Sequence, residues 1–358
     1  MSRIYNFSAG PSTLPLEVLE EAQAQLVDYQ GIGMSLMEVS HRGKAYKAVH
    51  EEALANLRDL LELSSDHEIL FLQGGATGQF AMVPLNLLRP GQVADYTNSG
   101  SWAKKAIAAA QKVGDVNVAA DCAGDRPTRV PDADELNLTE GAAYLHITTN
   151  ETISGAQWQA LPECETPLVA DMSSDILSRP MDYGRCALFY AGAQKNLGPA
   201  GVTLVGIRRD LAEESGAHLP GILRYKPHVD DDSMHNTPPC FAIYMLMLVT
   251  RWLKQEGLEN IFERNRNKAQ RLYDAIDASE FYRGTAAENC RSNMNVTFRL
   301  ANEDLEGVFA EQAEAEGLSG LKGHRSVGGL RASIYNAFPE AGVAALVSFM
   351  QEFERKNG

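Results

Sequence analysis

Hydrophobic positions change their spacing along this 358-residue chain, and each spacing predicts a different kind of element. Near the N-terminus, residues 15–29 and 44–63 have the 3.6-residue spacing of amphipathic helices. From residue 68 onward, short apolar runs alternate with helical windows. The runs are 68–72, 93–96, 143–149, 168–170, 187–190 and 202–207, and the windows are 76–88 and 102–113. Strands that are apolar on both faces need cover on both faces, so the pattern predicts an α/β fold with a mostly parallel sheet sandwiched by helices.

The pattern changes again after Pro238-Pro239. The predicted elements are helices over 240–255 and 258–278, a strand over 294–300, a helix over 304–316, a strand over 329–334 and a helix over 339–353. The last hundred residues are typical of a second, smaller α+β domain. We therefore predict an N-terminal arm over 1–14, a large domain over 15–257 and a small C-terminal domain over 258–358.

Composition narrows the range of functions. The formal net charge of −15 argues against a general affinity for nucleic acid or anionic membranes. The longest apolar stretch, 241–249, is about half of what a membrane span needs, and the N-terminus lacks the apolar core of a secretion signal. Five widely spaced cysteines form no metal-type pair. They indicate reduced thiols, so we expect a cytoplasmic protein without a bound metal. A local basic cluster could still bind a small anionic substrate.

Four polar segments follow predicted strands, where ligands lie in open α/β sheets. Gly74-Gly75 precedes a helix whose N-terminus suits a phosphate, although glycines also serve an ordinary tight turn. The spacing is neither a dinucleotide motif nor a P-loop. Asp171 ends a short strand, where a helix cap is the commoner alternative. A polar turn over 149–155 and the segment around Lys195 follow two further strands.

Lys195 has mostly small neighbours in the stretch YAGAQKNLGPAG, residues 190–201. A loop with an incidental lysine is the simplest interpretation of this stretch alone. Together with Asp171, a phosphate cradle and a nearby hydroxyl, however, Lys195 completes a set that suits pyridoxal phosphate. The amine forms a Schiff base with the aldehyde, and the aspartate pairs with the pyridine nitrogen. Small neighbours leave room for the cofactor, and a lowered pKa keeps the amine reactive.

Five motifs, spread in order over the whole chain, resemble those of the phosphoserine aminotransferases, a family of class-V, fold-type I pyridoxal-phosphate enzymes. They are NFSAGP at 6–11, EVSHRGK at 38–44, GAQKNLGPAG at 192–201, NTPP at 236–239, and KGHR through RASIYN at 322–336. The resemblance implies ping-pong transamination between L-glutamate and 3-phosphohydroxypyruvate in serine biosynthesis, giving O-phospho-L-serine and 2-oxoglutarate. Similar enzymes also handle 4-phosphohydroxy-L-threonine in pyridoxine biosynthesis.

The resemblance also implies a cofactor site. Lys195 matches the Schiff-base lysine, and Asp171 matches the partner of the pyridine nitrogen. A stacked aromatic ring, a hydroxyl beside the ring and the phosphate-binding positions are matched by Trp102, Thr152, Ala76, Thr77 and Gln194. Asn236 and Thr237 match residues that reach the phosphate from the other subunit, which implies a homodimer with shared active sites. From the residues alone, Trp102 is more typical of a core position.

The implied substrate residues supply the basic cluster. Arg331 matches the arginine that binds the substrate α-carboxylate through two hydrogen bonds, although a structural ion pair is an alternative. His324 and Arg325 match groups that bind the distal anion, and a solvated loop is the alternative for them. His41 and Arg42, expected from the partner subunit, match the rest of that group. His146 and His235 are expected to be structural.

Two departures and four competing functions qualify the resemblance. Thr77 stands where some members have an arginine, and Ala9 stands where some have a serine. Within the same fold, a cysteine desulfurase would use Cys290 as its nucleophile, and an alanine–glyoxylate aminotransferase would not need the His324-Arg325 pair. A non-catalytic binding module and a nicotinamide dehydrogenase also compete with the transaminase. The lack of GxGxxG after the first strand argues against the dehydrogenase.

Overall fold

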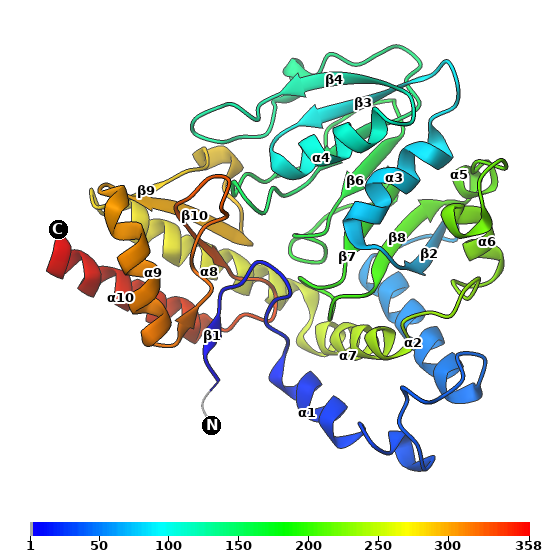
Figure 1. Ribbon diagram of the computed structural model, residues 1–358, viewed down its shortest axis with the longest axis horizontal. Coiled ribbons are helices and arrows are strands. Elements are labelled where there is room, and N and C mark those ends of the chain that lie inside the picture. The colour runs from blue at the N-terminus through cyan, green and yellow to red at the C-terminus, as the bar shows by residue number, and fades with distance from the viewer. Residues whose placement is uncertain (1–2) are drawn as a thin grey trace.

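The computed structural model describes residues 3–358 and is built around a seven-stranded sheet with the order β2-β8-β7-β6-β5-β3-β4 (Figure 1). The strands are β2 (His67–Leu72), β3 (Val93–Asn98), β4 (Asp115–Asp121), β5 (Leu145–Thr148), β6 (Leu168–Asp171), β7 (Cys186–Gly192) and β8 (Thr203–Arg208). β8 runs antiparallel to both of its neighbours, whereas the other pairings are parallel. The predicted α/β class with a mostly parallel sheet is confirmed.

Both faces of this sheet are covered by helices, as continuous apolar strands require. Along β6, Leu168 and Ala170 join one hydrophobic core, while Val169 joins another. The first core includes side chains of α2 (Lys44–Leu60) and α7 (Cys240–Glu256). The second includes side chains of α3 (Gly75–Leu87) and α4 (Ser101–Ala110). Each strand therefore presents alternate residues to two helical layers.

The C-terminal elements gather around a third core, at the left of Figure 1. A three-stranded antiparallel sheet has the order β12-β10-β9. Its strands and helices are β9 (Tyr282–Gly284), β10 (Asn295–Leu300), β12 (Leu330–Ser333), α8 (Leu258–Asp277), α9 (Glu306–Ala315) and α10 (Glu340–Asn357). β1 (Tyr5–Asn6) pairs with β11 (Leu318–Ser319), and Phe7 packs into the same core. The division into 1–14, 15–257 and 258–358 stays a prediction.

The remaining helices are α1 (Leu16–Ala24), α5 (Arg209–Glu213) and α6 (Tyr225–Asp230). The prediction of a helix over 15–29 was too long. Val27 is 82% exposed, so no packing supports another helical turn there, and a 3₁₀ turn (Tyr29–Gly31) follows. β4 was not predicted because it lies at the edge of the sheet and much of it is exposed. Within residues 3–358, no helix combines the length and the apolar character that crossing a membrane requires.

Candidate active site

The carboxyl ends of β5, β6 and β7 border a cavity of about 430 Å³, which we call the strand-end cavity. The parallel sheet places it where ligands lie in open α/β folds. Nine of the predicted site residues line it: Ala76, Thr77, Trp102, Thr152, Asp171, Gln194, Lys195, His324 and Arg331. Segments far apart in the sequence thus meet at one end of the sheet, as the motif positions predicted.

Lys195 follows β7 and lies partly buried in the strand-end cavity. Its Nζ donates a hydrogen bond to Thr152 Oγ1 at 2.7 Å and lies 5.8 Å from the centroid of the Trp102 ring. The N-terminal arm packs against it, since a Cβ on Gly10 would lie 3.5 Å from Lys195 Cγ. Burial lowers the pKa of the Lys195 ammonium to about 8, partly opposed by the charge of Asp171. A substantial fraction of this amine is therefore neutral near pH 8.

Asp171 is the last residue of β6 and is buried in the cavity wall. Its Oδ1 accepts a hydrogen bond from the Ser173 N–H at 2.9 Å, so the side chain closes a turn rather than capping a helix. Burial raises the pKa of this carboxyl, while Ser173 and the positive charge of Lys195 oppose the rise. The positive charge of Lys195 therefore favours the ionised form of the Asp171 carboxyl.

The N-terminus of α3 forms another part of the cavity wall. Gly74 and Gly75 have φ angles of +95° and +62°, which glycine adopts without strain. These turns bring the chain from β2 directly into α3, so that Gly74 through Thr77 line the cavity. Backbone N–H groups in the first helical turn have no intrahelical acceptor, and the helix dipole is positive there. The arrangement suits an anion such as phosphate.

Glu151 does not line the strand-end cavity but contacts Trp102, which does, and this role was missed although Glu151 lies within the predicted polar turn. It is fully buried, and its Oε1 and Oε2 accept hydrogen bonds from the N–H groups of Ala103 at 2.9 Å and Trp102 at 3.2 Å. It thereby caps α4, whose own N-cap, Gly100, has no side chain. A Cβ on Gly100 would lie 2.6 Å from Glu151 Cδ. Burial raises the pKa of the Glu151 carboxyl to about 7. The sequence contained one signal for this role. Glu151 is an acidic residue shortly after β5, and α4 begins after a glycine, which has no side chain to cap it.

Arg331 and His324 bring positive charge to the cavity from the C-terminal part of the chain. Arg331, on β12, donates from Nη1 to the Thr152 carbonyl oxygen at 3.3 Å. No carboxylate in residues 3–358 lies within 4.0 Å of it, so the alternative of a structural ion pair is wrong for this chain. His324 is half-buried, and its pKa is lowered by burial and by the charge of Arg331. Both side chains suit an anionic substrate.

Five predicted site residues do not line the strand-end cavity: His41, Arg42, Asn236, Thr237 and Arg325. His41 and Thr237 line a separate, mostly apolar cavity of about 690 Å³, which we call the apolar cavity. Arg42 and Arg325 are exposed. One chain alone therefore does not bring these five residues to Lys195, and their placement by a partner subunit stays a prediction.

The two histidines expected to be structural lie away from the cavity lining. His146 is buried, its Nε2 lies 2.8 Å from Tyr190 Oη, and its ring stacks on Tyr96. Burial lowers its pKa to about 3, so the ring stays neutral. His235 Nδ1 lies 2.9 Å from Asp231 Oδ2, within hydrogen-bond distance. Neither contact involves a residue that lines the strand-end cavity.

Known proteins share both the sequence and this architecture. The family model described as Aminotransferase class-V matches residues 4–346. A phosphoserine aminotransferase of Niallia circulans is 55% identical over 359 residues, covering 99% of this chain and 99% of the relative. The structure of the phosphoserine aminotransferase from Bacillus circulans subsp. alkalophilus is 54% identical, covers 99% of both chains and superposes with a TM-score of 0.96.

A pyridoxal-phosphate-bound phosphoserine aminotransferase from Trichomonas vaginalis is a more distant structural match. It is 39% identical, with a TM-score of 0.92 over 98% of this chain and 100% of that chain. The likeness therefore extends to a structure that contains the cofactor expected from Lys195 and Asp171. Since the family match spans nearly the whole sequence and relatives above 50% identity cover it end to end, the chain belongs to the class-V aminotransferase family.

Proposed function

We propose that this chain is a pyridoxal-phosphate-dependent transaminase that moves the amino group of L-glutamate to 3-phosphohydroxypyruvate. The products are O-phospho-L-serine and 2-oxoglutarate. One observation carries the proposal: Lys195, Asp171 and the N-terminus of α3 meet in one cavity that also receives Arg331. An amine, an acid, an anion cradle and a carboxylate-binding guanidinium are the groups that this chemistry needs. The similarity to phosphoserine aminotransferases over the full chain supports the choice of substrates.

The residues of the strand-end cavity fit the cofactor. Several lining residues have buried polar atoms without a partner in residues 3–358, among them Trp102 Nε1, Thr148 Oγ1 and Asn150 Oδ1. Buried polar groups are normally hydrogen-bonded, so a polar ligand is favoured there. Lys195 would hold the aldehyde and Asp171 the pyridine nitrogen. The α3 N-terminus and Gln194 would hold the phosphate, and Trp102 would stack on the ring. When bound, the cofactor withdraws electrons from the substrate α-carbon.

The proton transfer falls to Lys195. Its Nζ takes the proton from the substrate α-carbon as a general base and then returns a proton as a general acid. A pKa of about 8 suits both steps, because neither form of the amine is scarce near neutral pH. Thr152 Oγ1, 2.7 Å from Nζ, fixes where the amine points. The carbonyl of the same Thr152 holds Arg331, so one residue aligns the amine with the carboxylate-binding group.

Substrate binding divides between two ends of the ligand. Arg331 would bind the α-carboxylate through its planar fork, a contact that lysine cannot reproduce. His324 and Arg325 would bind the distal anion, together with His41 and Arg42 of a partner subunit. The distal group is a carboxylate in glutamate and a phosphate in the other substrate, and arginine with titratable histidine can serve both. The same groups make 4-phosphohydroxy-L-threonine a second substrate to assay.

A homodimer would complete this site. The lining of the apolar cavity includes Leu14, Met37, Phe241 and Met245, of which Met37 is 57% exposed. Apolar side chains gathered in this way are typical of an interface between subunits. His41 and Thr237 line the same cavity, so association through this surface would carry them toward a neighbouring chain. Asn236 and Thr237 would then reach the neighbour's cofactor phosphate.

The competing functions are less well supported. Cys290 is 4% exposed and packs in the first hydrophobic core, whereas a desulfurase needs an accessible nucleophile on a mobile loop. Thr77 and Ala9, the two departures, both line the strand-end cavity. Thr77 can still offer a hydroxyl and its backbone N–H to the phosphate, and neither departure removes a group that handles protons.

The test uses Lys195→Ala, with Lys112→Ala as the control. Lys112 is exposed, so its loss removes an equal charge without touching the cavity. We expect Lys195→Ala to lose the cofactor absorbance band near the visible edge and to lower the rate by a factor of about 10² to 10⁴ or more. Turnover of glutamate with 3-phosphohydroxypyruvate, but not with glyoxylate, supports the assigned substrates. An unchanged band in Lys195→Ala would refute the assignment.

A further inference from the structure

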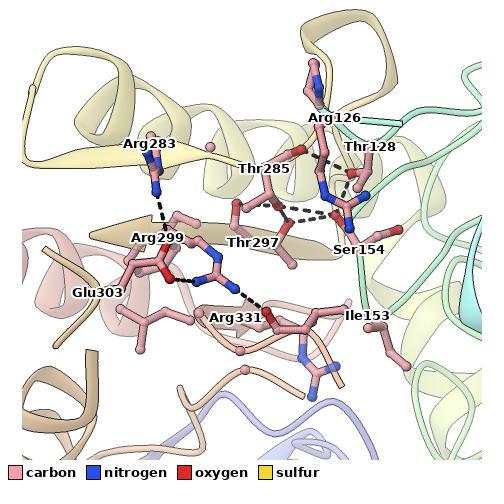
Figure 2. Close-up of a pocket in the computed structure, with 18 of the residues that line it drawn as sticks. Arg126, Thr128, Ile153, Ser154, Arg283, Thr285, Thr297, Arg299, Glu303 and Arg331 are labelled. Carbon is pink, nitrogen blue, oxygen red and sulfur yellow. Dashed lines mark hydrogen bonds and ion pairs between the residues drawn. The ribbon is translucent and has the colours of Figure 1, made fainter. Parts of the chain in front are cut away.

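A second cavity of about 650 Å³ lies beside the strand-end cavity, and we call it the arginine cavity. Ile153 and Arg331 line both cavities, so the two share part of a wall. Figure 2 shows the labelled arginines arranged around this space, with strands β9 and β10 behind it. The proton transfer and the cofactor contacts proposed for the strand-end cavity do not use this second space.

The lining of the arginine cavity is strongly basic. Its charged residues are Arg126, Arg283, Arg299, Arg331 and a single acid, Glu303. This local excess of positive charge stands out in a chain whose formal net charge is −15. Basic residues that line a hollow surface raise the local concentration of small anions and speed their capture.

The pairing of these side chains leaves positive charge uncompensated. Arg283 Nη2 and Arg299 Nη1 both contact Glu303, at 2.9 and 2.5 Å, and Arg299 Nη1 also lies 3.7 Å from Glu306 Oε1, so two carboxylates offset these two guanidinium groups. Arg126 has no carboxylate within 4.0 Å in residues 3–358, and its Nη1 donates to the Asp125 carbonyl oxygen. A guanidinium without an acidic partner is well suited to bind a phosphate or carboxylate through two hydrogen bonds.

The threonine hydroxyl groups of the cavity are already hydrogen-bonded. Thr297 Oγ1 and Thr128 Oγ1 donate to the Ser154 carbonyl oxygen at 2.8 and 3.1 Å, and Thr285 Oγ1 lies 2.6 Å from Thr297 Oγ1 (Figure 2). These contacts fix the main chain at Ser154, two residues from Thr152 and next to Ile153 of the shared wall. Arg299 Nη2 also donates to the Val327 carbonyl oxygen, so Arg126 and Arg331 are the two lining arginines without an acidic partner in residues 3–358 that remain for an anion.

A loop over residues 323–329 lies between the two cavities. The Gly323 N–H donates to the Gly329 carbonyl oxygen at 2.8 Å and closes its base, and Gly328 and Gly329 have φ angles of +70°. His324 lines the strand-end cavity, while Ser326 and Val327 line the arginine cavity. The same short loop thus contacts a ligand in either space.

We propose that the arginine cavity is an outer anion site that captures the phosphorylated substrate before it reaches Lys195. The inference rests on the proposed function, because 3-phosphohydroxypyruvate supplies the phosphate and the carboxylate that these arginines recognise. The ligand binds first at Arg126, whose charge has no acidic partner within 4.0 Å in residues 3–358, then passes the 323–329 loop to Arg331, which belongs to both cavities. Glutamate, which carries less negative charge, depends less on this route.

The experiment compares Arg126→Gln with Arg266→Gln. Arg266 is exposed on α8 and has no carboxylate within 4.0 Å in the described residues, so both variants lose one unpaired charge. For Arg126→Gln we expect kcat/KM for 3-phosphohydroxypyruvate to fall roughly three- to tenfold at low ionic strength, with kcat unchanged. The difference should shrink as salt approaches ~0.3 M, because screening shortens the reach of exposed charges. kcat/KM for glutamate should change less than about twofold, and Arg126→Lys should restore most of the loss.

The outcomes separate the inference from the proposed function. Equal kcat/KM values for Arg126→Gln and Arg266→Gln at low salt would overturn the outer site while leaving the transaminase assignment intact. An equal fall in kcat/KM for glutamate and 3-phosphohydroxypyruvate would also overturn the outer site, since we propose that this site captures the phosphorylated substrate selectively. Lack of any turnover of 3-phosphohydroxypyruvate by the unmodified protein would overturn the proposed function, and this inference with it.

Discussion

The two sides of the strand-end cavity differ in how they are built. The cofactor side, with Lys195 and Asp171, belongs to the ends of neighbouring strands and is enclosed by main chain that is mostly buried. The substrate side, with His324 and Arg325, belongs to a loop that is largely exposed and begins and ends at glycines. A single chain thus contains the whole lysine and aspartate pair but only part of the implied substrate side. The residues that must be aligned closely lie at the ends of buried strands. The residues that accept two different substrates lie on the exposed loop, which can adapt its conformation.

Arg331→Lys gives the largest change expected on the substrate side. A lysine keeps the charge but loses the planar two-point contact with the α-carboxylate, and hydrogen bonds to charged groups contribute about 1.5 to 3 kcal/mol. We expect kcat/KM for both substrates to fall by a factor of about 10 to 100, measured by steady-state kinetics. The absorbance of the bound cofactor should stay as in the unmodified protein. A changed absorbance would show that Arg331 also acts on the cofactor side, so that the two sides of the cavity are not independent.

Glu151→Gln tests the cofactor side with a smaller expected effect. The amide has one acceptor oxygen where the carboxylate has two, so one N–H of the α4 terminus loses its partner, at a cost of about 1 to 3 kcal/mol. Because Trp102 is one of the two capped residues, we expect several-fold weaker cofactor binding and a changed Trp fluorescence. Both can be followed by titration of the apoprotein.

Asp95→Asn is the matched control for Glu151. Asp95 is also fully buried and accepts hydrogen bonds from the N–H and Oγ1 of Thr139, both at 2.8 Å, but Thr139, unlike Trp102, does not line the strand-end cavity. We expect Asp95→Asn to lower the free energy of unfolding but to leave the affinity of the folded protein for the cofactor unchanged. If both variants weaken cofactor binding alike, Glu151 acts on the fold as a whole and not on the position of Trp102.

The smallest expected effect is a displaced pH midpoint. The folded pKa of Lys195 is lowered to about 8, below the ordinary value near 10.4, so the amine loses its proton at lower pH than an exposed lysine does. The rate at which the apoprotein captures the aldehyde cofactor should therefore rise from pH 7 to 9 and level off above that, with a midpoint near 8. Stopped-flow absorbance measures this rate. A rate that keeps rising beyond pH 10 would show that Lys195 has the ordinary pKa of an exposed lysine and that the cofactor side is open to solvent.

Much of the cofactor side could be predicted from the sequence because strand order and chain direction fix it. Asp171 and Lys195 each follow an apolar run, and parallel neighbouring strands necessarily bring such residues to the same end of the sheet. Glu151 could not be assigned because its role depends on a contact with α4, 48 residues earlier in the chain at Ala103. Nothing in the local pattern of either segment specifies that contact.

The substrate side was less predictable for a different physical reason. His41, Arg42 and Arg325 lie in segments whose position depends on what packs against them, and the pattern of one chain does not contain a second chain. The arginine cavity was not predicted at all. Its members come from separate segments around 126, 283 and 299, and only the tertiary fold brings them together.

The antiparallel direction of β8 has a consequence for the motion of Lys195. Because β7 and β8 are hydrogen-bonded neighbours, the lysine segment is a short connection whose two ends are tied together, with the Ala193 N–H donating to the Val202 carbonyl oxygen at 3.0 Å. The N–H groups of Leu197 and Gly198 both turn back to the Ala193 carbonyl oxygen. Amides closed in this way exchange with solvent only when the segment opens. Slow hydrogen exchange is therefore expected around Lys195, and faster exchange in the 323–329 loop, so that the ligand and the loop move while the amine stays in place.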